Sequence, residues 1–153
     1  NKQTVTMKFF STTLAVLAAA VTMAFSSCSS VNGLTPEKLN GEWNVTLLEG
    51  EPITPAENTP YIGFNFSENR LYGFTGCNRI MGGADLNAII KGKADFTKVG
   101  TTMMACPDDK YERKFLSALS RVKKAVAEKS VIKLVDADGN TVMELTGKND
   151  KAQ

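Results

Sequence analysis

The sequence predicts an α+β domain, mainly β, in which a curled antiparallel sheet or half-open β-barrel is covered by one α-helix. Two observations predict the sheet: short segments of alternating apolar and polar residues recur between Trp43 and Thr101, and another pair ends the domain. An apolar stripe at helical spacing begins at Tyr111 and predicts the helix. Strands and helices do not alternate along the chain, so nothing favours a parallel sheet.

Two alternating segments open the domain, separated by a loop at residues 49–60. Their apolar residues are expected to face the core, because successive side chains of a strand point to opposite faces. These residues are Trp43, Val45 and Leu47 in the first segment and Ile62, Phe64 and Phe66 in the second. A turn at Ser67-Glu68-Asn69 and a third strand at residues 70–75 complete a hairpin with the second segment.

The middle of the domain gives weaker signals. Four glycines at residues 76–92 predict irregular backbone or a short strand at residues 86–90. Residues 93–101 alternate again and predict a further strand.

One helix is predicted after Cys106-Pro107, with Asp108 as its N-cap and Asp109 near its positive end. Its core-facing stripe consists of Tyr111, Phe115, Leu119 and Val122. Basic residues in the last turn complement the helix dipole, and we interpret them as a solvated helix end rather than an anion site. They are Arg121, Lys123 and Lys124. Two strands then end the domain as a hairpin that turns at residues 136–140.

The N-terminal region is typical of an export signal. Met7-Lys8 resembles a translation start, so we interpret residues 1–6 as a start-site artefact. The apolar run at residues 14–25 matches the central segment of a signal peptide and is shorter than the ~18 residues of a membrane span.

A pattern typical of a bacterial lipobox ends this run, Phe25-Ser26-Ser27-Cys28. We expect cleavage before Cys28 and a diacylglyceryl thioether on its sulfur. An ordinary secretory signal cleaved near Ser27 and an uncleaved anchor are the alternatives. The expected organisation is a signal peptide at residues 1–27, a lipidated tether at 28–38, the domain at 39–147 and a polar tail at 148–153.

Charge and cysteine usage depend on that cleavage. The chain has 18 basic and 16 acidic residues, and the predicted signal removes Lys2 and Lys8 but no acid. A neutral mature domain gives no electrostatic case for nucleic acid. Cys77 and Cys106 remain as an even pair in an oxidising compartment, which favours a disulfide over reduced buried thiols. The bridge would close a loop of about thirty residues, worth roughly 3–4 kcal/mol in the chain-entropy model.

Two ordered motifs resemble those of a known family. The first comprises Trp43, Phe64, Gly73 and Gly76-Cys77-Asn78, and the second is Thr101-Thr102-Met103-Met104-Ala105-Cys106, a Thr-x-Met-x-Cys segment leading into the helix with Glu112 and Phe115. They resemble the META domain, also called the heat-shock protein HslJ-like lipoprotein family, over residues 39–145. The Asp138-Gly139 hairpin also has a family counterpart, whereas Met81-Gly82-Gly83-Ala84 stands where the family has an aromatic strand residue.

The resemblance implies a half-open antiparallel barrel with one helix, usually found in envelope lipoproteins or secreted proteins. Members are linked to stress and antibiotic tolerance, without an agreed enzymatic activity or ligand. A similar architecture occurs in lipoprotein pilots of outer-membrane secretins, which is an analogy of fold and does not give function.

The chemistry of the chain favours a protein without catalytic residues, metal or cofactor. The sequence has no histidine, which excludes Ser/His/Asp and Cys/His catalysis and His-ligated metals. The acidic turn at residues 136–140 has glycine at its fourth position, whereas a calcium loop needs it at the sixth, so a tight hairpin is the better interpretation. Soft ligands for Cu(I) could come from Cys77, Cys106, Met81, Met103 and Met104, which we interpret instead as a disulfide beside a methionine-padded core.

The Gly76-Cys77-Asn78 turn is the most position-specific feature. We interpret it as pinned through Cys77 to the segment that enters the helix. The alternative is that it lines a groove at the barrel mouth, formed by Gly76, Asn78, Thr102 and Met104.

The sequence therefore predicts a non-enzymatic, membrane-anchored envelope lipoprotein that supports envelope stress tolerance or assists a membrane-protein partner. A carrier of a small apolar ligand or lipid tail is the alternative, and a thiol–disulfide enzyme is a distant third. We expect a monomer held by its lipid, without nucleic acid. Ser29, with no acid before Glu37, favours the periplasmic face of the outer membrane.

Overall fold

The computed structural model describes residues 33–107 and 110–148. Its strands are β1 (Gly41–Leu48), β2 (Glu51–Pro52), β3 (Tyr61–Asn65), β4 (Arg70–Phe74), β5 (Arg79–Gly83), β6 (Val99–Thr101), β7 (Lys124–Glu128), β8 (Val131–Val135) and β9 (Thr141–Gly147). Its helices are α1 (Pro36–Leu39), α2 (Leu86–Ile90) and α3 (Glu112–Arg121).

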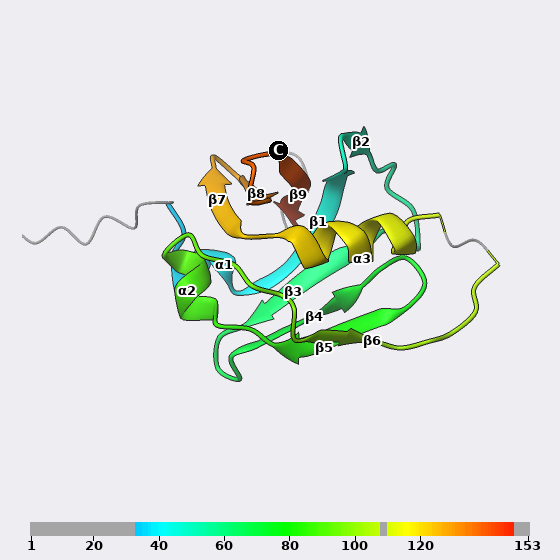
Figure 1. The fold of residues 1–153 in the computed structure, drawn as a ribbon, viewed down its shortest axis with the longest axis horizontal. Coiled ribbons are helices and arrows are strands. Elements are labelled where there is room, and N and C mark those ends of the chain that lie inside the picture. The colour runs from blue at the N-terminus through cyan, green and yellow to red at the C-terminus, as the bar shows by residue number, and fades with distance from the viewer. Residues whose placement is uncertain (1–32, 108–109, 149–153) are drawn as a thin grey trace, which may run out of the picture.

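Within the described residues, the strands form one antiparallel sheet in the order β6-β5-β4-β3-β1-β9-β8-β7, and β2 pairs with β1 beside this path. The sheet stays open, with β6 and β7 at its two edges. In Figure 1, α3 lies between the β3–β4–β5 and β7–β8–β9 parts of the sheet, while α1 and α2 lie together at one end. The predicted class, mainly β with a curled antiparallel sheet and a covering helix, is confirmed.

The core fills the space between α3 and the sheet. Phe115 and Leu119 of α3 are 0% and 3% exposed, and they belong to one buried cluster with Phe64 of β3 and Leu145 of β9. Burying each such side chain contributes about 1.5–3 kcal/mol. The predicted apolar stripe is confirmed at these helix positions, and Tyr111 packs against the cluster from its edge.

The first strand departs from the predicted alternation at its end. The pairing of β1 with β9 shifts between Val45 and Leu47, as in a β-bulge. An extra residue moves the following side chains to the other face, so Leu48 is buried with Val45 in place of the predicted Leu47. Trp43 is half-buried and donates its indole N–H to the Leu39 carbonyl at 2.9 Å.

The middle of the domain is more regular than predicted. Strand β5 pairs with β4 where irregular backbone was expected, and α2 occupies residues 86–90 in place of the predicted short strand. The carboxylate of Asp85 accepts the Ala88 N–H at 2.9 Å and caps this helix. A five-residue helix is too short for its apolar period to be visible in the sequence.

The predicted strand at residues 93–101 is wrong over its first part, because only Val99–Thr101 is a strand. Ala94 and Phe96 are nevertheless buried, at 4% and 3% exposure. The apolar alternation here reflects a loop packed on the core, and the Ala94 N–H donates to the Lys123 carbonyl at 2.9 Å.

Asp108 itself lies outside the described residues, but the prediction that it caps α3 is wrong, because Lys110 and Tyr111 are not helical and Tyr111 is the N-cap. The described helix begins at Glu112 and ends at Arg121, and Lys124, expected in its last turn, begins strand β7 instead. The strand was not predicted because its centre, Ala125-Val126-Ala127, contains two alanines, and alanine is a weak strand former.

The domain also begins earlier than residue 39. Leu34 and Leu39 are 1% and 0% exposed, and Leu39 is the last residue of α1. Thr35 caps this helix by accepting the Lys38 N–H at 3.3 Å. The last residues of the predicted tether therefore belong to the folded domain.

Substituting Gly73 of β4 should test how closely β3 and β4 approach. A Cβ at this residue would lie 2.3 Å from the Tyr61 carbonyl oxygen, so Gly73→Ala must displace backbone. We expect the free energy of unfolding to fall by about 1–3 kcal/mol in urea denaturation. Gly83→Ala in β5 is the matched control, because its Cβ would meet nothing within 4 Å. Equal losses in the two variants would contradict the close packing at Gly73.

Candidate functional site

The candidate site is built on the turn that joins β4 to β5. The Thr75 N–H donates to the Asn78 carbonyl at 2.8 Å, and the Thr75 hydroxyl accepts the Asn78 N–H at 2.9 Å. Both residues are buried, with exposures of 0% and 3%. Gly76 has a φ of +101°, a left-handed conformation that side chains rarely adopt. The turn thus holds its own backbone and directs the Asn78 side chain to one side.

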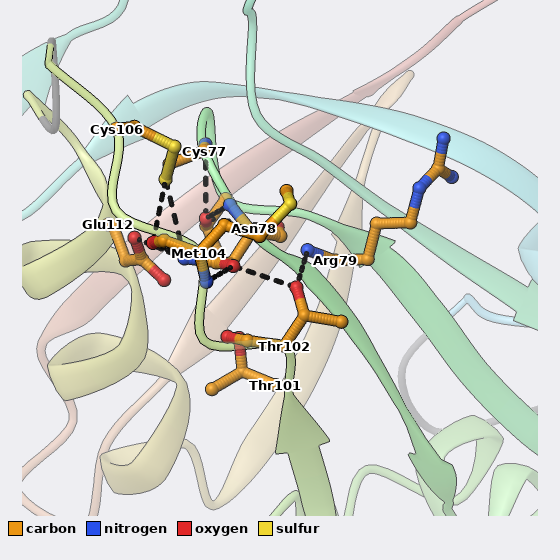
Figure 2. The surroundings of a disulfide bond; sticks show 9 residues. Cys77, Asn78, Arg79, Thr101, Thr102, Met104, Cys106 and Glu112 are labelled. Atoms are coloured by element: carbon orange, nitrogen blue, oxygen red, sulfur yellow. Dashed lines mark hydrogen bonds between the residues drawn. A yellow bond between two sulfur atoms is a disulfide. The ribbon is translucent and has the colours of Figure 1, made fainter.

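The Asn78 side chain binds the segment that follows β6. Its Oδ1 accepts the Met104 N–H at 2.7 Å and the Thr102 hydroxyl at 2.8 Å. Its Nδ2 donates to the Met104 carbonyl and to the Glu112 carboxylate, each at 3.0 Å (Figure 2). The amide therefore pairs with both backbone polar groups of Met104, as a neighbouring strand would. Its two donors and its acceptor are all used within the described protein.

A disulfide from Cys77, the residue before Asn78, holds the same segment after β6. It joins Cys77 to Cys106 across a Cα–Cα distance of 5.9 Å, within the usual range for such bridges. Thr102 is a third point of attachment between this segment and β5. Its N–H donates to the Arg79 carbonyl and its hydroxyl accepts the Arg79 N–H. We call this cluster the Asn78 clamp; it comprises Cys77, Asn78, Thr102, Met104, Cys106 and Glu112.

The predicted groove residues do not all meet. The structure brings Asn78, Thr102 and Met104 into direct contact, but Met104 takes part through its backbone and its side chain is 59% exposed. A side chain at Gly76 would instead meet the Asn58 carbonyl and the Tyr111 ring. Sequence reasoning missed Thr75, although a threonine three residues before an asparagine is a pattern typical of a side-chain-capped turn.

The expected methionine-padded core is wrong. The side chains of Met81, Met103 and Met104 are exposed, and Met103 is 96% accessible. The clamp holds Met104 by its backbone, which leaves the Met104 side chain in solvent beside that of Met103. A copper site also loses its strongest ligands, because disulfide sulfurs are not thiolates. Among the described residues, no cluster of three metal-ligating side chains is present.

The acidic turn between β8 and β9 uses its carboxylate internally. Asp136 Oδ1 accepts the N–H groups of Asn140 and Asp138, at 2.9 and 3.0 Å. These bonds, the Asn140 backbone bond foremost, lower the pKa of Asp136, although burial opposes the shift. Arg121 adds a weaker attraction from 3.8 Å. The carboxylate is directed into its own hairpin turn.

Replacing Asn78 should unfasten the segment after β6. Asn78→Ala leaves the Met104 N–H and carbonyl and the Glu112 carboxylate without this partner, and we expect a loss of about 2–4 kcal/mol in the free energy of unfolding. Asn87→Ala on the exposed surface of α2 is the control and should change stability by about 0.5 kcal/mol or less. A neutral result for Asn78→Ala in urea unfolding would show that the amide bonds are dispensable.

The Asp136 turn should make stability depend on pH. Because the pKa of Asp136 is lowered on folding, its contribution is present above the unfolded pKa of about 3.9 and disappears as pH falls through the lower folded pKa. Asp136→Asn should therefore be less stable than wild type at pH 6–7, and the difference should shrink below about pH 4. Unfolding curves at several pH values, with exposed Asp138→Asn as control, measure this. A difference that stays constant down to pH 2 would rule out the carboxylate as its cause.

Comparisons with known proteins agree with this fold and its motifs. The META domain model matches residues 33–149. The protein in one NMR structure is 20% identical in sequence to this chain. The two structures align with a TM-score of 0.57 over 74% of this chain and 94% of the other. An NMR structure of a protein from Burkholderia xenovorans is 23% identical, with a TM-score of 0.51 and coverage of 72% and 83%. At these identities the two structures show a shared fold alone.

No curated protein matches the chain. The family model, however, spans most of the sequence and includes both motifs of the Asn78 clamp. The predicted resemblance is confirmed, and the chain belongs to the META-domain family.

Proposed function

We propose that this protein is a non-enzymatic lipoprotein of the cell envelope, anchored through Cys28, whose META domain assists a membrane-protein partner or supports envelope stress tolerance. The observation that carries the proposal is the saturation of the Asn78 clamp. The Asn78 amide forms its hydrogen bonds with Met104, Thr102 and Glu112, so no donor or acceptor is left for a substrate. This suits a scaffold rather than a substrate site. The lack of histidine in the whole chain also supports a non-enzymatic role.

The packing of the core weighs against the carrier alternative. A ligand held between α3 and the sheet would have to displace Phe64 and Phe115, which are 1% and 0% exposed. Two surface hollows, of about 520 and 540 Å³, lie away from this core. Their linings include charged side chains such as Lys93 and Asp95 in the first and Glu37 in the second. Both hollows are open to solvent and would leave an apolar cargo in contact with water, whereas a carrier site encloses most of its ligand.

The thiol–disulfide alternative meets a similar obstacle. Exchange requires a thiolate to reach a disulfide sulfur, and Cys77 is only 5% exposed. The two cysteines are separated by 29 positions, which differs from the Cys-x-x-Cys spacing of redox enzymes. A structural bridge that holds a loop, buried at Cys77 and half-buried at Cys106, is a better description of this pair.

We attribute membrane attachment to the proposed lipid on Cys28. The described chain contains no helix with the length and apolar character of a membrane span. The proposed acyl group on Cys28 would stand five positions before Gly33, the first described residue. We place the anchor in the outer membrane with the domain in the periplasm, because Ser29 follows the cysteine. The domain would act there as a monomer that contacts an envelope protein and no nucleic acid.

Replacing the lipidated cysteine should release the protein from membranes. Cys28→Ser removes the sulfur that forms the thioether, so the variant should lack acyl mass and leave the membrane fraction. Intact-mass measurement and fractionation of cells check both effects, with Ser30→Ala as control. A wild-type chain without acyl mass on Cys28 would refute the anchor. Affinity purification from native membranes then tests the partner, and recovery of the anchored chain alone would count against it.

A further inference from the structure

A small apolar hollow lies where the described chain begins. Its volume is about 240 Å³, and its lining includes Gly33, Leu34, Trp43 and Ile132. Leu34 and Ile132 are buried, whereas Gly33 is exposed at the entrance. The hollow therefore has an apolar floor beside the point where the proposed tether enters the domain.

Two lysines border this hollow. Lys38 belongs to α1, and its ammonium donates to the Gly33 carbonyl at 3.4 Å; Lys129 lies in the turn between β7 and β8. The neighbouring Glu128 pairs with Lys133 instead. Within the described part of the chain, neither bordering lysine has a carboxylate within 4.0 Å, so both positive charges are available to an anion.

Chain length limits how far this hollow can lie from a membrane. Five residue steps separate Cys28 from Gly33, and a fully extended chain advances at most ~3.6 Å per residue. The entrance is therefore within about 18 Å of an acylated Cys28. In Figure 1 the chain enters beside α1 and α2, at the opposite end of the molecule from the loop between β6 and α3. An anchored domain would turn this end toward the bilayer.

Trp43 gives the hollow a side chain suited to the membrane interface. Its indole N–H is already bonded to the Leu39 carbonyl, so its half-buried ring presents apolar surface. Tryptophan is enriched at the level of lipid headgroups, where one side of the ring meets apolar chains and the other meets water. The arrangement thus combines an apolar wall, two cations and a short connection to the anchor.

We propose that this hollow binds the headgroup region of an anionic phospholipid, with the phosphate between Lys38 and Lys129 and the glycerol and first acyl carbons against Trp43. The inference rests on the proposed anchoring through Cys28. Positive charge near a bilayer favours anionic over zwitterionic lipids, and that preference weakens as salt screens the charges. Binding would hold the domain in one orientation instead of letting it swing on its tether.

The single tryptophan of the chain makes the test direct, because its fluorescence reports on this hollow alone. The acylated, full mature chain is added to vesicles whose acyl chains carry bromine, a fluorescence quencher, made of phosphatidylcholine with or without phosphatidylglycerol. We expect at least about twofold stronger quenching of Trp43 with phosphatidylglycerol, reduced by high salt. Lys38→Gln/Lys129→Gln should lower quenching to the level of pure phosphatidylcholine.

Lys91→Gln/Lys93→Gln is the matched control, since it removes the same charge from two exposed lysines that do not line this hollow, and it should retain full quenching. Flotation of every sample separates the two hypotheses. A chain that fails to float with any vesicle overturns the anchor and this inference together. A chain that floats, but whose quenching ignores phosphatidylglycerol or the Lys38 and Lys129 substitutions, overturns this inference alone. An equal emission change with soluble glycerol phosphate would also overturn it, because the hollow would then take free phosphate rather than lipid.

Discussion

The Asn78 amide is the interaction on which one whole end of the domain depends. The connection from β6 to α3 has no regular secondary structure between Thr102 and Pro107, and ordering such a segment costs about 1–2 kcal/mol per residue. Little apolar burial offsets that cost, since Met103 and Met104 are exposed. The clamp supplies the restraint instead, through the disulfide and the paired hydrogen bonds of Asn78. It thereby delivers α3 to the sheet at a defined point.

Helix α3 in turn joins the two edges of a sheet that does not close. Its first residue, Glu112, bonds Asn78 beside β5, on the β6 side of the sheet. Just beyond its last turn, the Lys123 N–H donates to the Val135 carbonyl on β8, and the Lys123 carbonyl accepts the Ala94 N–H from the loop before β6. A closed barrel would obtain this connection from strand pairing. Here a helix fixed at both ends connects the edges and seals the core with Phe115 and Leu119.

The sequence is informative where a signal is local and repeated. Ile62 and Phe64 alternate in β3, and the stripe of α3 recurs over three turns, so both elements could be predicted. The bulge in β1, which buries Leu48 in place of Leu47, could not be predicted, because it is defined by how β1 pairs with β9. The clamp is harder still. Asn78 meets Met104 and Glu112 across 26 and 34 positions; the cysteine pair connected the two segments beforehand, but nothing in the sequence predicted these amide bonds.

The two ends of the molecule are held by different interactions, and this difference is compatible with the tethered scaffold that we propose. At the end where the chain enters, Leu34 and Leu39 are buried, so hydrophobic packing fixes the first turn of the domain directly to its core. If the proposed anchor is present, a pull on it would therefore act on the core rather than on a loose loop. At the other end, covalent and polar restraints hold a segment whose methionine side chains face solvent. Because the backbone of Met104 is bonded and Cys106 is bridged, this segment is held without the methionine side chains. Packing thus holds the first turn of the domain on the core, while the clamp holds the segment after β6 in place at the opposite end.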